Sequence, residues 1–195
     1  MRKILLVSSA LLLVVSCHTE APSAAAPPSP PAPAAPAPAA AGTVAVAGIH
    51  FTPPAGWVAE GPHPMRVATY QVPRAPGDSE DSECAVYYFG RGQGGEVQAN
   101  LSRWLGQFQG PPAKWDRQET MTVSGVPVTE VEQAGTFLWS ASPMSPEKTP
   151  KPSWRLLGAI VQAPEGLVFL KLTGPAATVS AARPAFDGLL KSIAR

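Results

Sequence analysis

The sequence has few of the residues that build catalytic and metal centres. Its 195 residues include three histidines and two cysteines, and it has no G-x-S-x-G motif for a serine nucleophile. After residue 42 the metal-ligating candidates other than carboxylates are His50, His63 and Cys84, and their spacing matches no zinc site. We therefore predict that the chain is not an enzyme and holds no metal ion and no cofactor.

Long apolar runs and basic runs are also missing. The apolar stretch 4–15 is twelve residues long, which is short of the roughly 20 residues that cross a bilayer as a helix. All but Arg2 and Lys3 of the 15 basic residues, and all but Glu20 of the 14 acidic residues, follow residue 42. This part of the chain is neutral, and we predict no nucleic-acid partner for it.

The first residues nevertheless form a recognisable pattern. Two basic residues precede the apolar stretch, and Val14-Val15-Ser16-Cys17 follows it. This pattern resembles the signal and lipobox of bacterial lipoproteins, in which an aliphatic and a small residue precede the cysteine. The resemblance implies a signal peptide over residues 1–16, a diacylglycerol on Cys17 and an acyl chain such as palmitate on the new N-terminus. An ordinary secretory signal, cleaved elsewhere, is the alternative.

Lipid on Cys17 predicts both the location and the redox state of the chain. Two or three acyl chains anchor a protein stably in a membrane. His18, rather than an aspartate, follows the cysteine, which favours the outer membrane facing the periplasm if the host is Gram-negative. Cys84 then has no cysteine left to pair with inside the chain, so the fold does not depend on a disulfide.

A low-complexity segment separates the signal from the folded part. Residues 18–42 contain eight prolines and eleven alanines, too few large apolar side chains to form a core. We predict a disordered linker over residues 17–42, beginning at the lipidated cysteine. In an extended polyproline conformation it spans up to about 80 Å.

The folded domain is predicted to occupy residues 43–195. Alternating and β-branched runs predict strands, and apolar residues three and four apart predict helices. In the strand 126–139, Thr129 and Val131 alternate with two glutamates, which predicts one buried and one solvent-facing side. The expected strands cover residues 44–51, 65–72, 84–89, 115–123, 126–139, 154–162 and 167–173, and the expected helices cover 97–108 and 179–193, with Pro184 kinking or restarting the second.

Three features resemble the Mog1/PsbP-like superfamily. They are the strand that leads into Phe51-Thr-Pro-Pro-Ala-Gly-Trp57, the helix after the third strand, and the closing helix that contains Ala185–Ile193. The resemblance implies an α+β fold in which about six to seven antiparallel strands are covered by two helices. It also implies a protein-binding rather than an enzymatic role.

Two polar segments are candidate ligand sites. The run Gly90-Arg-Gly-Gln-Gly-Gly95 matches G-x-G-x-x-G and predicts either a flexible turn or a weak anion site at the start of a helix. Asp78, Glu80, Asp81 and Glu83 form either a solvated acidic loop or a calcium site, although their spacing is not that of an EF-hand. The residues of the weak anion site are Arg91, Gly92, Gly95 and Arg103.

A proline-rich segment, residues 140–153, is the third candidate. Loops of this length inside compact domains are either functional or mobile. We predict either a mobile insertion or a partner-binding loop, and the residues of the possible partner loop are Trp139, Lys148, Lys151 and Trp154.

These features together predict a lipid-anchored, monomeric protein of the cell envelope. It would bind an envelope protein or assist one, and the membrane would be its second partner through the lipid on Cys17. The alternative is an extracytoplasmic enzyme or small-ligand or metal-binding protein, whose site would be assembled from His50, His63 and the acidic residues 78–83.

Replacing Cys17 with Ser tests the anchor. The sulfur is the atom that would carry the lipid, so Cys17→Ser should abolish acyl labelling and leave the precursor unprocessed by the lipoprotein pathway. Metabolic labelling with a palmitate analogue measures this. Normal labelling of the variant would rule out the anchor.

Overall fold

The computed structural model describes residues 42–141 and 145–195. The predicted signal, Cys17 and nearly all of the linker lie outside these residues. The strands are β1 (Val44–Val46), β2 (Ile49–Phe51), β3 (Val58–Ala59), β4 (Arg66–Val72), β5 (Ser82–Tyr88), β6 (Arg117–Val123), β7 (Val126–Trp139), β8 (Thr149–Ala163) and β9 (Gly166–Pro175), and the helices are α1 (Val97–Leu105) and α2 (Ala176–Lys191).

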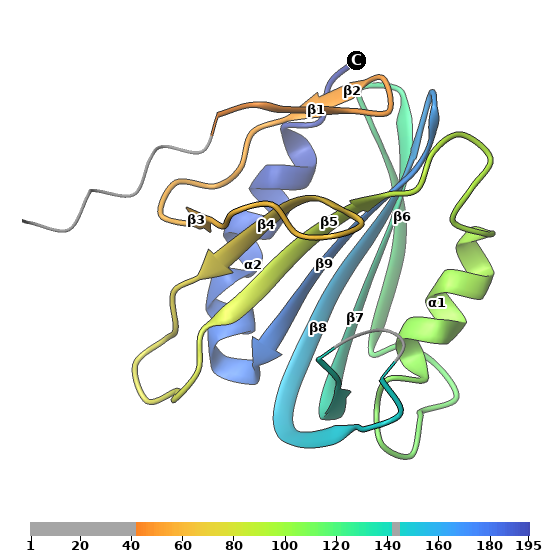
Figure 1. Ribbon diagram of the computed structural model, residues 1–195. Coiled ribbons are helices and arrows are strands. Elements are labelled where there is room, and N and C mark those ends of the chain that lie inside the picture. The colour runs from red at the N-terminus through yellow and green to blue at the C-terminus, as the bar shows by residue number, and fades with distance from the viewer. Residues whose placement is uncertain (1–41, 142–144) are drawn as a thin grey trace, which may run out of the picture. The chain divides into compact units, whose positions relative to one another are not determined.

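Seven of these strands form one antiparallel sheet with a helix on each face (Figure 1). The strand order is β3-β4-β5-β9-β8-β7-β6, so the hairpin of β8 and β9 lies in the middle. The predicted class is therefore confirmed: an α+β fold with an antiparallel sheet of about six to seven strands and two covering helices.

Tight turns join the later strands into hairpins. Ser124 and Gly125 both have positive φ, at 49° and 75°, as the favoured two-residue hairpin turns require. They connect β6 to β7, between the strands predicted over residues 115–123 and 126–139. Pro164 and Glu165 connect the central strands β8 and β9, because Ala163 pairs directly with Gly166.

The first predicted strand is wrong in one respect. Residues 44–51 form a small separate hairpin, β1 and β2, instead of one continuous strand. Ala47 and Gly48 turn the chain with φ values of 52° and 77°. The loose alternation of apolar residues continues on both sides of this turn and therefore predicts a single strand.

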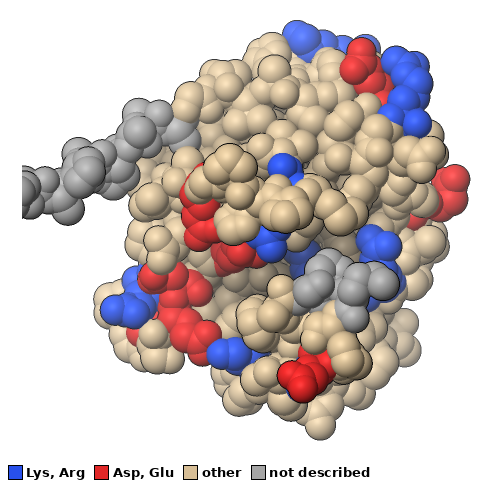
Figure 2. Space-filling view, viewed as in Figure 1, with Lys and Arg blue, Asp and Glu red and all other residues tan. Residues whose placement is uncertain are grey.

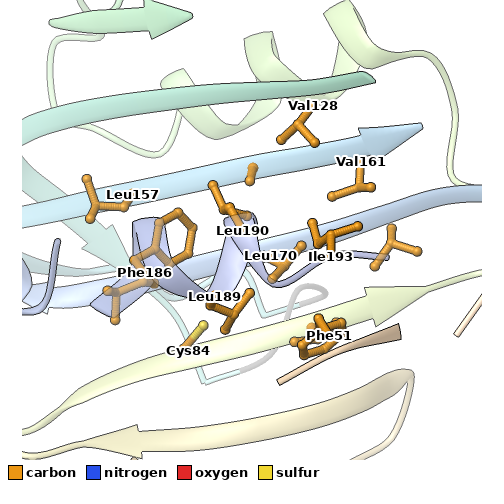
Figure 3. Close-up of a cluster of buried hydrophobic side chains, with 14 of the residues drawn as sticks. Phe51, Cys84, Val128, Leu157, Val161, Leu170, Phe186, Leu189, Leu190 and Ile193 are labelled. Atoms are coloured by element: carbon orange, nitrogen blue, oxygen red, sulfur yellow. The ribbon is translucent and has the colours of Figure 1, made fainter. Parts of the chain in front are cut away.

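The face of the sheet under α2 carries the larger apolar cluster (Figure 3). Phe186 and Leu190 of α2 pack over Leu157 of β8, and Phe51 closes the same cluster from β2. Cys84 of β5 is fully buried there, and burial raises the pKa of its thiol far above the ordinary value. The thiol is thus neutral and acts as a small apolar side chain.

Helix α1 covers part of the opposite face. Leu101 and Trp104 bury their side chains against Ile160 and Phe169. The Trp104 ring lies so close to Gly158 that an added Cβ atom would stand 2.5 Å from it. A glycine in the central strand therefore makes room for the tryptophan. The central strands are therefore covered on both faces.

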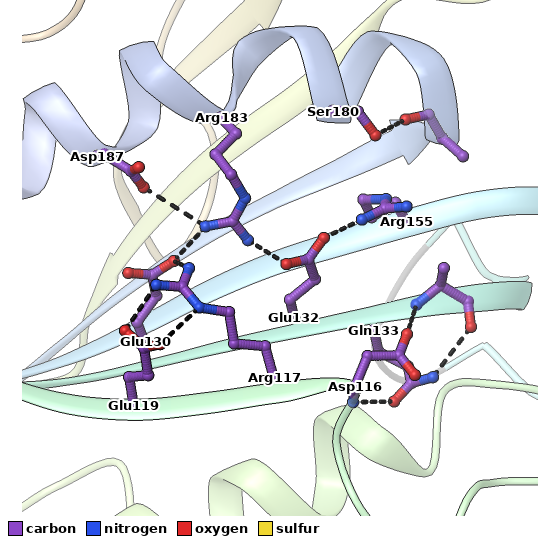
Figure 4. Close-up of polar contacts among 12 residues, drawn as sticks. Asp116, Arg117, Glu119, Glu130, Glu132, Gln133, Arg155, Ser180, Arg183 and Asp187 are labelled. Carbon is purple, nitrogen blue, oxygen red and sulfur yellow. Dashed lines mark hydrogen bonds and ion pairs between the residues drawn. The ribbon is translucent and has the colours of Figure 1, made fainter.

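Two glutamates of β7 correct another prediction. Glu130 and Glu132 were expected to face solvent, but they are only 4% and 8% exposed beneath α2 (Figure 4). Arg183 of α2 donates from Nη1 to Glu130 Oε1 at 2.9 Å and from Nη2 to Glu132. Arg117 and Arg155, from the neighbouring strands, each pair with one of the same carboxylates. The charges are buried because three arginines from separate elements neutralise them.

The start of α2 is held by a side chain from the acidic loop. Asp78 Oδ2 accepts hydrogen bonds from Thr178 N at 2.9 Å and from Thr178 Oγ1 at 2.5 Å, and its charge suits the positive end of the helix. Of the two behaviours expected for Pro184, the restart is wrong, because α2 is one continuous helix from Ala176 to Lys191.

The predicted loop over residues 140–153 is shorter in the structure. Strand β8 already begins at Thr149, which pairs with Trp139 across the hairpin. Strand β9 joins β8 only at Trp154, so the first five residues of β8 have β7 alone as a neighbour. A strand with one open side tolerates a proline such as Pro150. The backbone N–H that proline lacks would have no neighbouring strand to bond with on that side. The prediction of a structureless loop is therefore wrong from Thr149 onward.

Replacing Arg183 tests the buried ion-pair network. Arg183→Ala leaves the carboxylates of Glu130 and Glu132 with Arg117 and Arg155 only, and we expect the free energy of unfolding to fall by about 2 kcal/mol. Arg195→Ala, which removes an exposed arginine that donates to the Gly125 carbonyl, should cost less than about 0.5 kcal/mol. Urea unfolding measures both values. Equal losses would contradict a structural role for the network.

Candidate functional site

An open cleft lies beside the acidic loop at the end of the β7–β8 hairpin. Its volume is about 380 Å³. Figure 2 shows acidic side chains gathered on the left of a hollow in this face of the molecule. We call it the acidic–aromatic cleft, and it is lined by Glu80, Asp81, Glu83, Trp139, Thr149, Lys151, Trp154 and Thr173. It unites two segments that were separate candidates in the sequence.

The acidic wall of the cleft is held in place by hydrogen bonds. Asp81 Oδ2 accepts from Gln71 Nε2 at 2.6 Å, and Asp81 Oδ1 accepts from the backbone N–H of Arg74 at 3.0 Å. Glu83 lies on β5 and pairs with Arg66 of β4 at 2.8 Å. Since Asp78 caps α2 and does not line the cleft, the predicted acidic loop serves two separate purposes.

The aromatic wall consists of two tryptophans that flank the end of the β7–β8 hairpin. Trp139 is 41% exposed, which is unusual for so large an apolar side chain. Trp154 is buried and stacks on Phe137, with ring centroids 5.7 Å apart and planes at 11°. One indole is therefore fixed by packing, and the other offers apolar surface to solvent.

Lys151 joins the two walls. Its Nζ atom donates to both carboxylate oxygens of Glu80 at 2.8 Å and lies 5.5 Å from the centroid of the Trp154 ring. The lining thus carries three carboxylates and one ammonium group, and since Arg66 pairs with Glu83, the excess of negative charge lies at Asp81. A cleft of this composition is suited to positively charged or hydrogen-bond-donating groups.

The residues of the predicted partner loop are only partly brought together. Trp139, Lys151 and Trp154 line the acidic–aromatic cleft, whereas Lys148 is absent from the lining and donates to Ser140 Oγ at 3.3 Å. The sequence does not predict that the acidic residues contribute to the same cleft, because the pairing of Lys151 with Glu80 joins positions 71 residues apart.

The weak anion site at residues 90–95 has a simpler structural account. The side chain of Asn100, which is 1% exposed, donates to the carbonyl oxygens of Gly94 at 2.8 Å and Glu96 at 2.9 Å. Arg103 donates to the same asparagine, while Arg91 is exposed on the loop. Gly92 and Gly95 have φ values of 70° and 75°, as a tight turn requires. The geometry favours the turn, and the anion site stays a prediction.

The candidate histidines and the cysteine lie in three different environments. His50 pairs through its backbone with Ala194, His63 Nε2 lies 2.8 Å from Glu60 Oε2, and Cys84 is in the core. Within residues 42–141 and 145–195, no three His, Cys, Asp or Glu side chains are grouped in a way that would hold a metal ion.

Lys171 was missed by the sequence analysis. It lies on β9, two positions before Thr173 of the cleft and on the same side of the sheet. Its ammonium group donates to Gln107 Oε1 and lies 5.1 Å from the centroid of the Phe137 ring. Desolvation by burial, only partly opposed by the charge of Glu83, lowers the pKa of Lys171 to about 7. The sequence signal for this buried lysine is its position as the single charged residue in the otherwise apolar run 167–172.

Replacing Lys171 with Met should remove a pH dependence of stability. The unfolded chain binds the lysine proton up to pH 10.5 and the folded chain only up to about pH 7, so the wild type gains stability as pH rises between these values. The gain is at most about 1.4 kcal/mol per pH unit. Urea unfolding over this range should show the rise in the wild type and a flatter profile in Lys171→Met. Parallel profiles would contradict the shift.

Comparison with protein-family models finds no matching family, and comparison with curated proteins finds no significant match. Neither helix of the described residues is long and apolar enough to cross a membrane. The lipoprotein signal and the Mog1/PsbP-like resemblance therefore stay predictions, which rest on the residues quoted for them.

Proposed function

We propose that the chain is a lipid-anchored lipoprotein of the cell envelope, and that its domain binds another envelope protein, or assists one, through the acidic–aromatic cleft. The lipid on Cys17 would provide the attachment, and residues 18–42 would provide the reach. In a Gram-negative host the anchor would be in the outer membrane and the domain would face the periplasm.

The exposure of Trp139 at the edge of the cleft is the observation on which this proposal rests. Tryptophan is among the residues that contribute most to protein–protein binding when a partner covers it. Here the exposed indole stands beside the buried Trp154, the ammonium group of Lys151 and three carboxylates. An apolar anchor surrounded by charged groups is the arrangement that protein interfaces use for affinity and orientation.

Attachment to the membrane makes weak binding sufficient. A tethered domain meets partners on the same surface at a high effective concentration, so that a modest contact area gives useful occupancy. The cleft is open and its volume of about 380 Å³ accommodates one or two side chains of a partner. Small-molecule sites begin at about 300 Å³, so a small-ligand binder is the second candidate.

Removing the exposed indole tests the proposal. Trp139→Ala should reduce chemical crosslinking of the protein to its partner in living cells about tenfold, because truncating an anchor residue costs more than 1 kcal/mol. The matched control is Met65→Ala, which truncates a side chain 70% exposed on the β3–β4 connection and should leave crosslinking unchanged. Quantitative mass spectrometry of the crosslinked complexes is the measurement.

Two outcomes would contradict the proposal. Crosslinked complexes that are equally abundant for the wild type and Trp139→Ala would show that the cleft is not the contact site. Equal reduction by both variants would show that crosslinking depends on exposed apolar surface in general and not on the cleft. Urea unfolding of purified Trp139→Ala checks that the fold is intact, since an exposed side chain contributes little to stability.

A further inference from the structure

We propose that the acidic–aromatic cleft recognises a lysine side chain of the partner, whose ammonium group replaces that of Lys151 between Glu80 and Trp154. The inference rests on the proposed function and adds the chemistry of the partner. It follows from a positively charged group that the structure already shows in the cleft, the chain's own Lys151.

Glu80 and Trp154 together form a receptor for an ammonium group. Both oxygens of the Glu80 carboxylate accept hydrogen bonds from Lys151 Nζ at 2.8 Å. The same nitrogen lies 5.5 Å from the centroid of the Trp154 ring, within the range of a cation–π contact. A carboxylate on one side and an aromatic face on the other are the groups that stabilise a primary ammonium.

The charge of the cleft favours a second positive group. With Lys151 on Glu80 and Arg66 on Glu83, Asp81 still adds a negative charge to the lining. Asp81 is oriented by uncharged donors, the Gln71 amide and the Arg74 backbone, so these bonds do not neutralise it. The cleft therefore attracts a cation even while the internal ammonium occupies Glu80.

Lys151 is well placed to leave its position. It belongs to the first five residues of β8, which have a neighbouring strand on one side only. Its side chain is 26% exposed and that of Glu80 is 45% exposed, so the pair is accessible to water. Ion pairs at such exposure are weak, and a lysine has four rotatable bonds along which to move aside.

The rival explanation is that this ion pair only fastens the acidic loop to β8. The two explanations predict opposite signs for one substitution. If Lys151 merely fastens the loop, removing its amine loosens the acidic wall and weakens or leaves unchanged the binding of an added ammonium. If Lys151 occupies a receptor, removing its amine vacates that receptor and strengthens binding.

The test uses the peptide Ala-Lys-Ala, acetylated at its N-terminus and amidated at its C-terminus, as the probe. The chain has five tryptophans, and their indole N–H signals in NMR spectra report where the probe binds. The signals of Trp139 and Trp154, assigned with Trp139→Phe and Trp154→Phe, should shift on titration. Those of Trp57 and Trp104, which belong to the core, should not.

Three variants give the expected pattern. Lys151→Ala should bind the probe about tenfold more tightly, since an internal competitor that holds a site nine-tenths of the time reduces apparent affinity by that factor. Glu80→Gln should bind the probe about threefold more weakly than the wild type. Lys148→Ala is the matched control, because it removes the same charge three residues away without vacating Glu80, and it should bind within about twofold of the wild type.

Several results would overturn the inference. Binding by Lys151→Ala that is weaker than or equal to that of the wild type, or tightening that is equal in Lys151→Ala and Lys148→Ala, would show that no receptor is vacated. The absence of any shift of the Trp139 and Trp154 signals, or equally tight binding of a probe whose lysine Nε atom is acetylated, would show that the cleft does not recognise an ammonium group. If the probe does not bind while Trp139→Ala still loses its crosslinked partner, the inference falls and the proposed function stands. If the probe binds as expected but no partner depends on Trp139, the cleft binds an ammonium group, but the proposed function falls and the partner's lysine falls with it.

Discussion

The β7–β8 hairpin extends beyond the end of β9, and this difference in strand length shapes the candidate site. Strand β9 ends at Pro175 and leads directly into α2, while β8 begins five residues before Trp154, the residue that pairs with Pro175. The extension carries Trp139 and Lys151 past the packed part of the sheet. Without it, Trp139 and Lys151 would not stand opposite the acidic wall, and the cleft would lose that side.

The acidic wall is fixed by the same end of the sheet. Asp78 accepts hydrogen bonds from Thr178 in the first turn of α2, which ties the loop before β5 to the helix that follows β9. Asp81 is held by the backbone after β4. The loop is therefore anchored at two points, and Glu80 between them meets the extended hairpin. Helix capping and cleft formation depend on one short segment.

Periodicity and turn residues predicted most elements, because these signals are local. The strands on either side of Ser124 and Gly125 and the apolar face of α1 are examples. Burial of Glu130 could not be predicted, since its neutralising partner Arg183 lies 53 positions away and α2 covers the face on which the glutamate lies. The cleft could be predicted only in parts: the flanking tryptophans and the acidic loop were visible separately, but strand register brings them together.

Photo-crosslinking from the cleft in living cells tests the central claim most directly. A photoreactive amino acid at position 149, an exposed position that lines the cleft and leaves Trp139 in place, should capture a specific envelope protein, and the crosslinked peptide of that protein should contain a lysine beside the attachment point. The same amino acid at position 122, exposed on the edge strand β6, should not capture it. Identical products from the two positions would contradict a role for the acidic–aromatic cleft in binding.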